Sequence, residues 1–329
     1  MTLKHLLIFI LFFLSRPLFS QDTSFIANIK IPTFIDTLFI DHDRNNWSIR
    51  LFTNYKNNRF QLITADENVL YSPNNPAGFG FGFGTRKVIL DLAFNIKRKD
   101  KEPTERIDLQ ATLMLNNHII NFVLQTYQGY NVSAQNLSYF RKDIRSFSSS
   151  LSYMYMFNAS EYSIAALKSG LSRQKKPAFT SGLGSFLFLN RISSDSSIIP
   201  QNEFHGYTEE IRIVNLPGVG AGVLANISAT VPFLKSFFVS ASFTPGIGLM
   251  WKYVETESVS YHPSNPLLYQ FDLGGMLGYN ADRYYINLSM GYALYKTSLD
   301  FGNSIMYNTV KAKLALGYKL GQNLGRNKK

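Results

Sequence analysis

The sequence has no cysteine among its 329 residues. Disulfides therefore cannot hold the fold together, although exported soluble domains of this size often use them. Barrels of the bacterial outer membrane mostly do without them. We also expect no lipoprotein anchor, because such an anchor needs a cysteine directly after the export signal. The absence of cysteine is compatible with an exported membrane barrel but does not by itself select one.

Long hydrophobic runs are scarce as well. Residues 6–14 form a run of nine apolar side chains, whereas a membrane-spanning helix needs about 20. Lys4 and His5 give the run a short positive start. These features predict a secretory signal peptide over residues 1–20 that is cleaved near Ser20. Later apolar segments are interrupted by polar residues or glycine and predict no membrane-spanning helix.

Acidic residues are outnumbered by basic ones, 22 against 33. The predicted signal holds two of the basic residues and no acid, so the mature chain keeps 31 basic residues against 22 acidic ones, a net charge of +9. An exported protein rarely meets nucleic acid. We therefore expect outer-membrane lipids and lipopolysaccharide as partners, with a small anionic solute as a further candidate. The machinery that inserts outer-membrane barrels is also an expected partner.

What the sequence has in abundance is alternation of apolar and polar residues. In residues 306–320, six apolar side chains share one parity, and basic or small side chains occupy the other. Alternate side chains of a strand point to opposite faces, so this stretch has one apolar and one polar face. The pattern recurs along most of the chain. It predicts an all-β fold, a transmembrane antiparallel β-barrel of about 12 strands, within a range of roughly 10–14. A soluble exported β-protein is the remaining alternative.

The predicted barrel occupies residues 47–320, after a periplasmic lead-in at 21–46 and before a polar tail at 321–329. Thirteen segments qualify as strands, but single-chain bacterial barrels have an even number. We prefer twelve, with residues 47–64 forming one strand. Residues 161–171 fit either a short strand, which would make fourteen, or an amphipathic helix.

The connections alternate between short turns and long loops, as expected for periplasmic turns and outer loops. Residues 131–143 and 296–305 are among the predicted long loops. Tyr269 and Tyr279 share the outward parity and lie ten residues apart. At about 3.3 Å per residue and a tilt of about 40°, they span roughly 25 Å, the height of a lipid-facing band with an aromatic girdle at each rim.

Residues 77–85 alternate phenylalanine with glycine, which is unusual for a strand. Repeated glycine indicates either that a bulky group approaches the glycine face or that the sheet is tightly bent. We regard bending as the commoner cause. A phosphate-binding loop is excluded, because no Gly-Lys-Ser/Thr and no helix follow.

Several short motifs occur in a characteristic order. They are Tyr71-Ser-Pro-Asn74, Gln125-Thr-Tyr127-Gln-Gly129-Tyr130, Tyr162-Ser163, Gln174-Lys-Lys176 and Ser181-Gly182. Their order resembles that of a family of uncharacterised outer-membrane β-barrel proteins of Gram-negative bacteria, a domain of unknown function. The resemblance covers most of the mature chain. It implies the barrel fold and a location in the outer membrane of a Gram-negative bacterium, and it carries no assigned activity.

Charged residues of inward parity are expected to line the lumen. They are Arg50, Asp91, Arg106, Asp108, Lys252, Asp272, Lys311 and Lys313. Such mixed charge either forms internal salt bridges that occlude the barrel or lines a path for solutes. With about 12 strands, side chains alone do not necessarily fill the interior. We favour a partly occluded lumen in a non-enzymatic protein, either a porin-like channel or a structural, envelope-maintenance barrel.

A lipid-modifying enzyme is the alternative function. His262 and Ser264 lie in a segment that resembles the His-x-Ser-Asn motif of outer-membrane phospholipase A. The resemblance implies that His262 is the base and Ser264 the nucleophile of a phospholipase or lipid A acyl hydrolase. That family has glycine where this chain has Pro266, and Pro263 also favours an outer-loop turn.

The remaining histidines of the mature chain, His42, His118 and His205, are expected on exposed segments. No metal-binding spacing such as His-Glu-x-x-His is present in the sequence. We therefore predict neither a metal nor a cofactor.

Overall fold

The structure is a computed structural model that describes residues 36–42, 45–64, 68–96, 102–134, 137–199 and 208–322. The predicted signal peptide, most of the lead-in, the end of the polar tail and His205 lie outside the described residues. The side chain of His42 lies outside them too.

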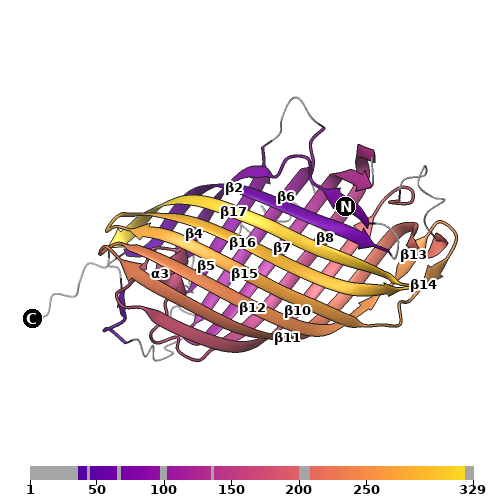
Figure 1. The fold of residues 1–329 in the computed structure, drawn as a ribbon. Coiled ribbons are helices and arrows are strands. Elements are labelled where there is room, and N and C mark those ends of the chain that lie inside the picture. The colour runs from indigo at the N-terminus through magenta and orange to yellow at the C-terminus, as the bar shows by residue number, and fades with distance from the viewer. Residues whose placement is uncertain are drawn as a thin grey trace, which may run out of the picture. The chain divides into compact units, whose positions relative to one another are not determined.

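Within the described residues, twelve antiparallel strands form a closed ring (Figure 1). In chain order they are β2 (Asn45–Ile63), β4 (Ala77–Thr85), β5 (Val88–Asn95), β6 (Glu105–Leu115), β7 (His118–Ala134), β8 (Leu137–Met156), β10 (Ala178–Ser193), β11 (Ile213–Phe233), β12 (Phe237–Lys252), β15 (Leu267–Asn280), β16 (Tyr284–Asp300) and β17 (Asn303–Gln322). Each strand pairs with the next in this order, and β17 pairs with β2 to close the ring. The twelve-strand antiparallel barrel predicted from alternation is confirmed.

Shorter elements decorate the ring. They are β1 (Ile40–His42), β3 (Asn68–Ser72), α3 (Ile164–Lys168), β9 (Ser172–Gln174), the 3-10 helix η2 (Glu209–Ile211), β13 (Val254–Thr256) and β14 (Ser260–Tyr261). Segment 161–171, for which the sequence left helix and strand open, thus contains a short helix. In the described part of the chain, no helix is long and apolar enough to cross a membrane.

The two ends of the barrel differ. At one end, called the inner end here, β2 begins, β17 ends, and short turns at 86–87, 116–117, 234–236 and 281–283 join neighbouring strands. The opposite, outer end carries β3, η2, β13 and β14. This asymmetry matches the short inner turns and longer outer connections expected of outer-membrane barrels.

Two of the predicted outer loops are wrong. Residues 131–134 continue β7 and residues 137–143 belong to β8, and the two pair as a hairpin with Ala134 opposite Leu137. Residues 296–305 continue β16 and β17, which pair up to Asp300 and Asn303 and turn through Gly302 at φ +75°. Their polar composition indicated loops. Antiparallel pairing continues because these strand ends rise beyond the apolar band, where polar side chains can meet water.

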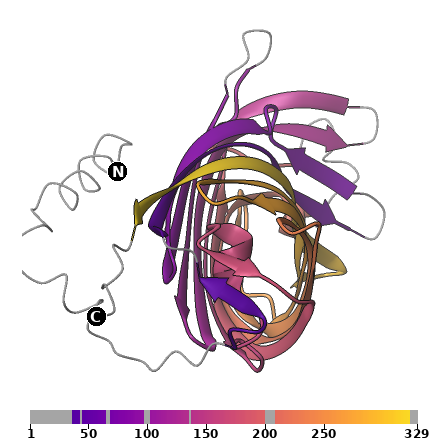
Figure 2. The ribbon, with the colours of Figure 1, turned by 90° about the vertical axis from the view of Figure 1, so that its left-hand side faces the viewer.

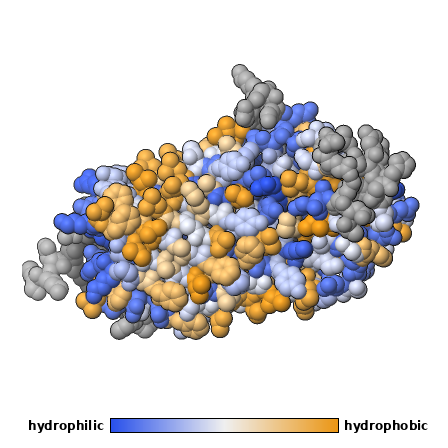
Figure 3. Space-filling model, in the orientation of Figure 1, coloured by the Kyte–Doolittle hydropathy of each residue, from blue (hydrophilic) through white to orange (hydrophobic). Residues whose placement is uncertain are grey.

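Apolar side chains cover the outside of the ring. On β17, Leu314, Leu316 and Tyr318 are exposed, while the intervening Ala315 is buried. On the face shown in Figure 3, hydrophobic side chains gather over the left-hand half of the barrel wall. Exposed aromatic side chains sit near the inner end at Trp47, Phe179, Phe237, Tyr284 and Tyr318, and farther out at Tyr55, Phe79, Trp251 and Tyr269. An apolar band edged by aromatic residues is the outer surface of an outer-membrane β-barrel.

Candidate functional site

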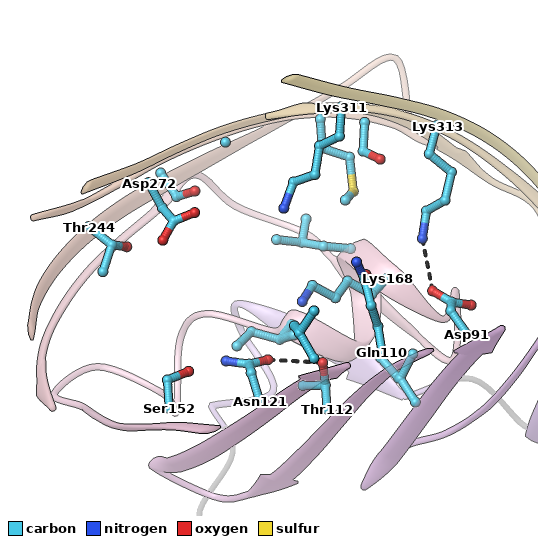
Figure 4. A pocket seen from close by; sticks show the side chains of 18 of the residues that line it. Asp91, Gln110, Thr112, Asn121, Ser152, Lys168, Thr244, Asp272, Lys311 and Lys313 are labelled. Carbon is cyan, nitrogen blue, oxygen red and sulfur yellow. Dashed lines mark hydrogen bonds and ion pairs between the residues drawn. The ribbon is translucent and has the colours of Figure 1, made fainter. Parts of the chain in front are cut away.

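The lumen encloses a cavity of about 470 Å³, called the chamber here (Figure 4). Strands from around the ring and the helix α3 line it. Six of the eight charged residues predicted to line the lumen do so: Arg50, Asp91, Asp108, Asp272, Lys311 and Lys313. The other two, Arg106 and Lys252, lie elsewhere inside the barrel. The chamber is therefore the place where the charged inward faces of the strands meet.

One ion-pair network is centred on Asp91 of β5. Arg50 Nε donates to Asp91 Oδ1 at 2.7 Å, and Lys313 Nζ donates to Oδ2 at 2.8 Å. The Arg50 and Asp91 side chains are 3% and 10% exposed, whereas the Lys313 side chain is 28% exposed. Both carboxylate oxygens are satisfied, so this network links β2, β5 and β17 and leaves no charge of Asp91 unpaired.

A second network is centred on Asp108 of β6. Lys56 Nζ donates to Asp108 Oδ1 at 2.7 Å, and Arg106 Nε lies 3.8 Å from Oδ2. Arg106 also donates to Asn54 Oδ1 at 2.8 Å and to the carbonyl oxygens of Lys56 and Pro76. The Arg106 side chain is fully enclosed and braces the wall, so it does not face the chamber.

The glycines of β4 make room for these networks. A Cβ at Gly82 would lie 2.1 Å from Asp91 Oδ1 and 2.7 Å from Arg50 Nε. A Cβ at Gly78 would lie 2.1 Å from Arg106 Nη2. Real Cβ atoms do not come so close to other heavy atoms. Close approach by bulky side chains therefore explains the glycine face, although bending strain had been the favoured explanation.

Lys252 lies at the outer side of the lumen, where its ammonium group is hydrogen-bonded. Its Nζ donates to the Asn265 carbonyl at 2.7 Å and to Thr297 Oγ1 at 2.8 Å. These bonds hold the 253–266 connection against β16. The residue therefore fastens an outer connection and is not part of the chamber wall.

The two candidate catalytic residues have separate partners. His262 Nδ1 lies 3.1 Å from the carbonyl oxygen of Lys252, and the ring packs on Tyr253. The Ser264 backbone N–H donates to Asp300, as does that of Asn265. Burial raises the pKa of Asp300, but these amide donors, together with the Ser264 hydroxyl and the charge of Lys252, outweigh it and hold the pKa below its ordinary value. Between these described residues no hydrogen bond joins His262 to Ser264, so the motif forms a turn bound to the β16–β17 hairpin.

His118 lies at the inner end, where its Nδ1 is 2.8 Å from the Tyr153 hydroxyl. The described ranges contain no group of three or more histidine, aspartate or glutamate side chains that could hold a metal ion.

The inner side of the chamber is closed by the connection between β8 and β10, residues 157–177, called the plug here (Figure 2). The Ser163 side chain caps α3 by accepting from the Ala166 N–H at 3.1 Å. Wall side chains then donate to carbonyl oxygens of the plug: Asn287 to Leu167 at 2.8 Å, Arg50 to Lys168 at 2.9 Å, Ser48 to Ser169 at 3.0 Å and Asn280 to Ser172 at 2.8 Å. The carbonyl end of the helix is thereby satisfied by the barrel wall.

The lead-in strand β1 holds the plug from the other side. β1 pairs with β9, bringing Ile40 opposite Gln174. The Lys175 N–H donates to the Phe39 carbonyl at 2.7 Å, and the Asp36 N–H donates to the Ser160 carbonyl at 3.1 Å. Neither this pairing nor the plug was predicted. The sequence gives one indication of the plug: in residues 163–170, apolar and polar residues do not alternate as they do in the strands.

Aromatic and aliphatic side chains close the outer side. Phe188 of β10 stacks on Tyr295 of β16 with ring centroids 4.5 Å apart, and Tyr307 meets Phe188 edge-on. β10 and β16 are not neighbours in the ring, so this contact spans the lumen. Beyond it lies the outer cluster, a buried core of Phe60, Leu62, Val69, Tyr71, Tyr127, Tyr130, Val132, Ala134, Ile144, Ile192, Ile198, Ile199, Ile211, Ile213, Leu216, Val254, Leu299 and Ile305. The lumen is thus occluded on both sides of the chamber.

Solved structures with a similar arrangement are outer-membrane proteins. The outer membrane protease OmpT of Escherichia coli shares 7% identity, with 85% of this chain and 98% of that chain covered and a TM-score of 0.35. An outer membrane channel of Pseudomonas putida F1 shares 8%, with 83% and 96% covered and a TM-score of 0.37. The toluene transporter TodX of P. putida shares 5%, with 84% and 90% covered and a TM-score of 0.29.

No curated protein matches the sequence. A family profile does match, and it covers residues 34–320, which include the whole described barrel apart from its last two residues. That profile is a domain of unknown function, DUF4421. The chain therefore belongs to the DUF4421 family.

Proposed function

We propose that this protein acts in the outer membrane of a Gram-negative bacterium as an occluded barrel that admits a small polar solute when its plug moves. The chamber is the observation that carries the proposal, because a purely structural barrel needs no cavity with charged side chains in its wall between two closures. The predicted signal peptide, cleaved near Ser20, and insertion by the barrel-assembly machinery would place it there. The apolar band would contact phospholipid and lipopolysaccharide.

The plug is the closure expected to move. Its attachments to the wall include hydrogen bonds from side chains such as Asn287 and Ser48 to backbone carbonyls, beside a small apolar contact of Leu167 with the wall. Each such bond contributes only about 1 kcal/mol net, because water can replace it. The outer cluster is a dry core, and opening it would expose large apolar side chains to water. Passage would therefore begin at the inner end.

Ion conductance in a planar bilayer tests the proposal. The wild-type barrel is expected to show almost no conductance steps. Replacing both Asn287→Ala and Ser48→Ala removes two fastenings of the plug and should produce frequent steps. Asn121→Ala is the matched control: it also removes a lumen amide, but one that accepts from Thr112 on β6 at 2.9 Å. That control should stay as silent as the wild type.

Two outcomes would contradict the proposal. Stable, frequent steps in the wild type would mean that the lumen is not occluded. A double variant that is folded and heat-modifiable yet remains silent would mean that the outer cluster is a permanent seal. A structural, envelope-maintenance role would then be the better account.

A further inference from the structure

Two lysines stand in the chamber with no carboxylate partner among the described residues. Lys311 of β17 and Lys168 of α3 both line the cavity and are solvent-exposed although the barrel wall surrounds them. Their exposed surface therefore faces the chamber. Considering the described side chains, no carboxylate lies within 4 Å of either ammonium group. Figure 4 shows both side chains reaching into the space, while Lys313 beside them is bonded to Asp91.

The fold sets both lysines in place. Lys311 lies opposite Gly291 of β16, and a Cβ at Gly291 would come within 2.5 Å of Lys311 Cε. The missing side chain at Gly291 therefore gives the lysine stem a groove along the wall. Lys168 is held through its own carbonyl, which accepts from Arg50 Nη1 at 2.9 Å. Both ammonium groups are thus presented by fixed backbone and are not borne on loose loops.

The charges around the chamber do not balance. Five cationic side chains line it, at Arg50, Lys56, Lys168, Lys311 and Lys313. Three carboxylates do so, at Asp91, Asp108 and Asp272, which leaves an excess of two positive charges. Asp91 and Asp108 are engaged by Arg50, Lys313 and Lys56 at 2.7–2.8 Å. One positive charge of the excess therefore belongs to the Asp91 network, where Arg50 and Lys313 share one carboxylate. The other belongs to Lys168 and Lys311, which Asp272 offsets only in part.

The polar groups of the chamber are arranged unevenly. In Figure 4, Asp272 and Thr244 lie together at one side, away from Lys168 and Lys313. Asp272 accepts from Gln270 Nε2 at 3.2 Å. Uncharged donors such as Ser152 line the wall facing Lys311. The side of the chamber with Lys168 and Lys313 thus offers ammonium groups and neutral donors, and Asp272 stands on the other side, where it interacts electrostatically with Lys311.

We propose that the chamber is a binding site for a small organic anion bearing carboxylate or phosphate groups, with Lys168 and Lys311 as its charged ligands. The inference deepens the proposed function, on which it rests, by naming the class of solute. Fixed ammonium groups in an enclosed site attract anions far more strongly than those on an open surface do. A cavity of about 470 Å³ is also within the usual size range of small-molecule sites.

Binding is tested by isothermal titration calorimetry on the purified full chain in zwitterionic detergent at low salt. Citrate and inorganic phosphate are the two probes, since they separate carboxylate from phosphate recognition. The titration is run on the wild type and on the plug-released Asn287→Ala, Ser48→Ala variant, so that a closed plug cannot hide the site. Saturable one-to-one binding of at least one probe is expected, weakening as salt screens the charges.

Three substitutions locate the site. Lys311→Met and Lys168→Met should each weaken binding about tenfold or more, as expected for loss of a charged hydrogen-bond donor. Asp272→Asn should strengthen it, because it removes the one opposing charge that neither network engages. Lys296→Met is the matched control: Lys296 is exposed on β16 at the parity opposite to the lumen residue Tyr295, so its loss should change nothing.

The inference is overturned if neither probe binds saturably to either form, or if Lys296→Met weakens binding as much as Lys311→Met. Titration needs no passage through the membrane. A barrel that binds a probe but never conducts would support the binding site and contradict the proposed passage of a solute. A plug-released barrel that conducts but binds neither probe would support the passage of a solute and contradict the binding site.

Discussion

Gly82 shows how closely the inward face is packed around its charges. A Cβ there would collide with the Asp91 carboxylate, with Arg50 and with the Leu90 carbonyl. We predict that Gly82→Ala displaces the ion pair and destabilises the barrel by about 1–3 kcal/mol, the usual cost of overpacking. Gly275→Ala is the control, because a Cβ at that glycine meets nothing within 4 Å. Urea unfolding in lipid vesicles measures both, and equal midpoints would contradict the packing argument.

For single residues, the sequence predicts which face of a strand a side chain occupies better than it predicts which residue that side chain contacts. A period of two assigned Lys313 and Asp91 to the lumen, but nothing local indicates that they bond, since 222 residues separate them. Nor could alternation tell Lys311, which projects into the chamber, from Lys252, which is fastened to backbone and Thr297. These differences depend on what stands opposite in the closed ring. The motif at His262 shows the same limit: His262 and Ser264 are close in sequence, but their hydrogen bonds go to different partners, Lys252 and Asp300.

Among the elements, the hairpin of β7 and β8 supports a pH prediction. Arg141 donates to both oxygens of Asp143 at 2.8 and 2.7 Å and also binds the Ser197 carbonyl in the connection after β10. The Asp195 N–H donates to Asp143 Oδ2 at 3.1 Å. The hydrogen bond from Arg141 holds the pKa of Asp143 below its ordinary value. The stabilisation is therefore complete above the ordinary aspartate pKa of about 3.9 and disappears as pH falls through the lowered native pKa.

Amide hydrogen exchange checks this link. The protection factor at Asp195 should be constant from neutral pH down to about pH 5 and should fall several-fold below about pH 4. In Asp143→Asn it should already be low at neutral pH, while Leu224 in mid-strand β11 stays protected in both proteins. Unchanged protection at Asp195 in the variant would show that the carboxylate does not hold this connection.

Regular elements were predictable and interruptions were not. Alternation located the strands because the lipid-facing side demands apolar residues at every second position. The plug could not be predicted for two reasons. Its helix α3 has only five residues, too few to show a helical period. The carbonyl groups at the end of α3 accept hydrogen bonds from distant wall side chains such as Asn287, which local sequence does not reveal. The sequences of the β7–β8 and β16–β17 hairpins predict loops, because beyond the apolar band a strand no longer needs an apolar face. Hydrogen bonding alone continues the strand there.

At the scale of the whole molecule, the outward band should behave as a surface solvated by lipid. Leu314 is 52% exposed on β17, four residues before the inner-girdle Tyr318. Arginine near the bilayer midplane costs about 2–4 kcal/mol, and near the interfaces about 0–1. We predict costs of these sizes for Leu314→Arg and for Leu234→Arg respectively, because Leu234 is 77% exposed in an inner-end turn.

Reversible unfolding of both variants in lipid vesicles measures the difference. Both substitutions replace an exposed leucine with arginine. The effects of the added charge therefore nearly cancel when the two costs are compared. The remaining difference reports the depth of each residue in the bilayer. A large cost at Leu314 alone would require hydrocarbon around the barrel. Equal, small costs would mean that water or protein covers the band, as in a soluble exported β-protein, and the proposed outer-membrane location would then be wrong even though the twelve-strand ring remained.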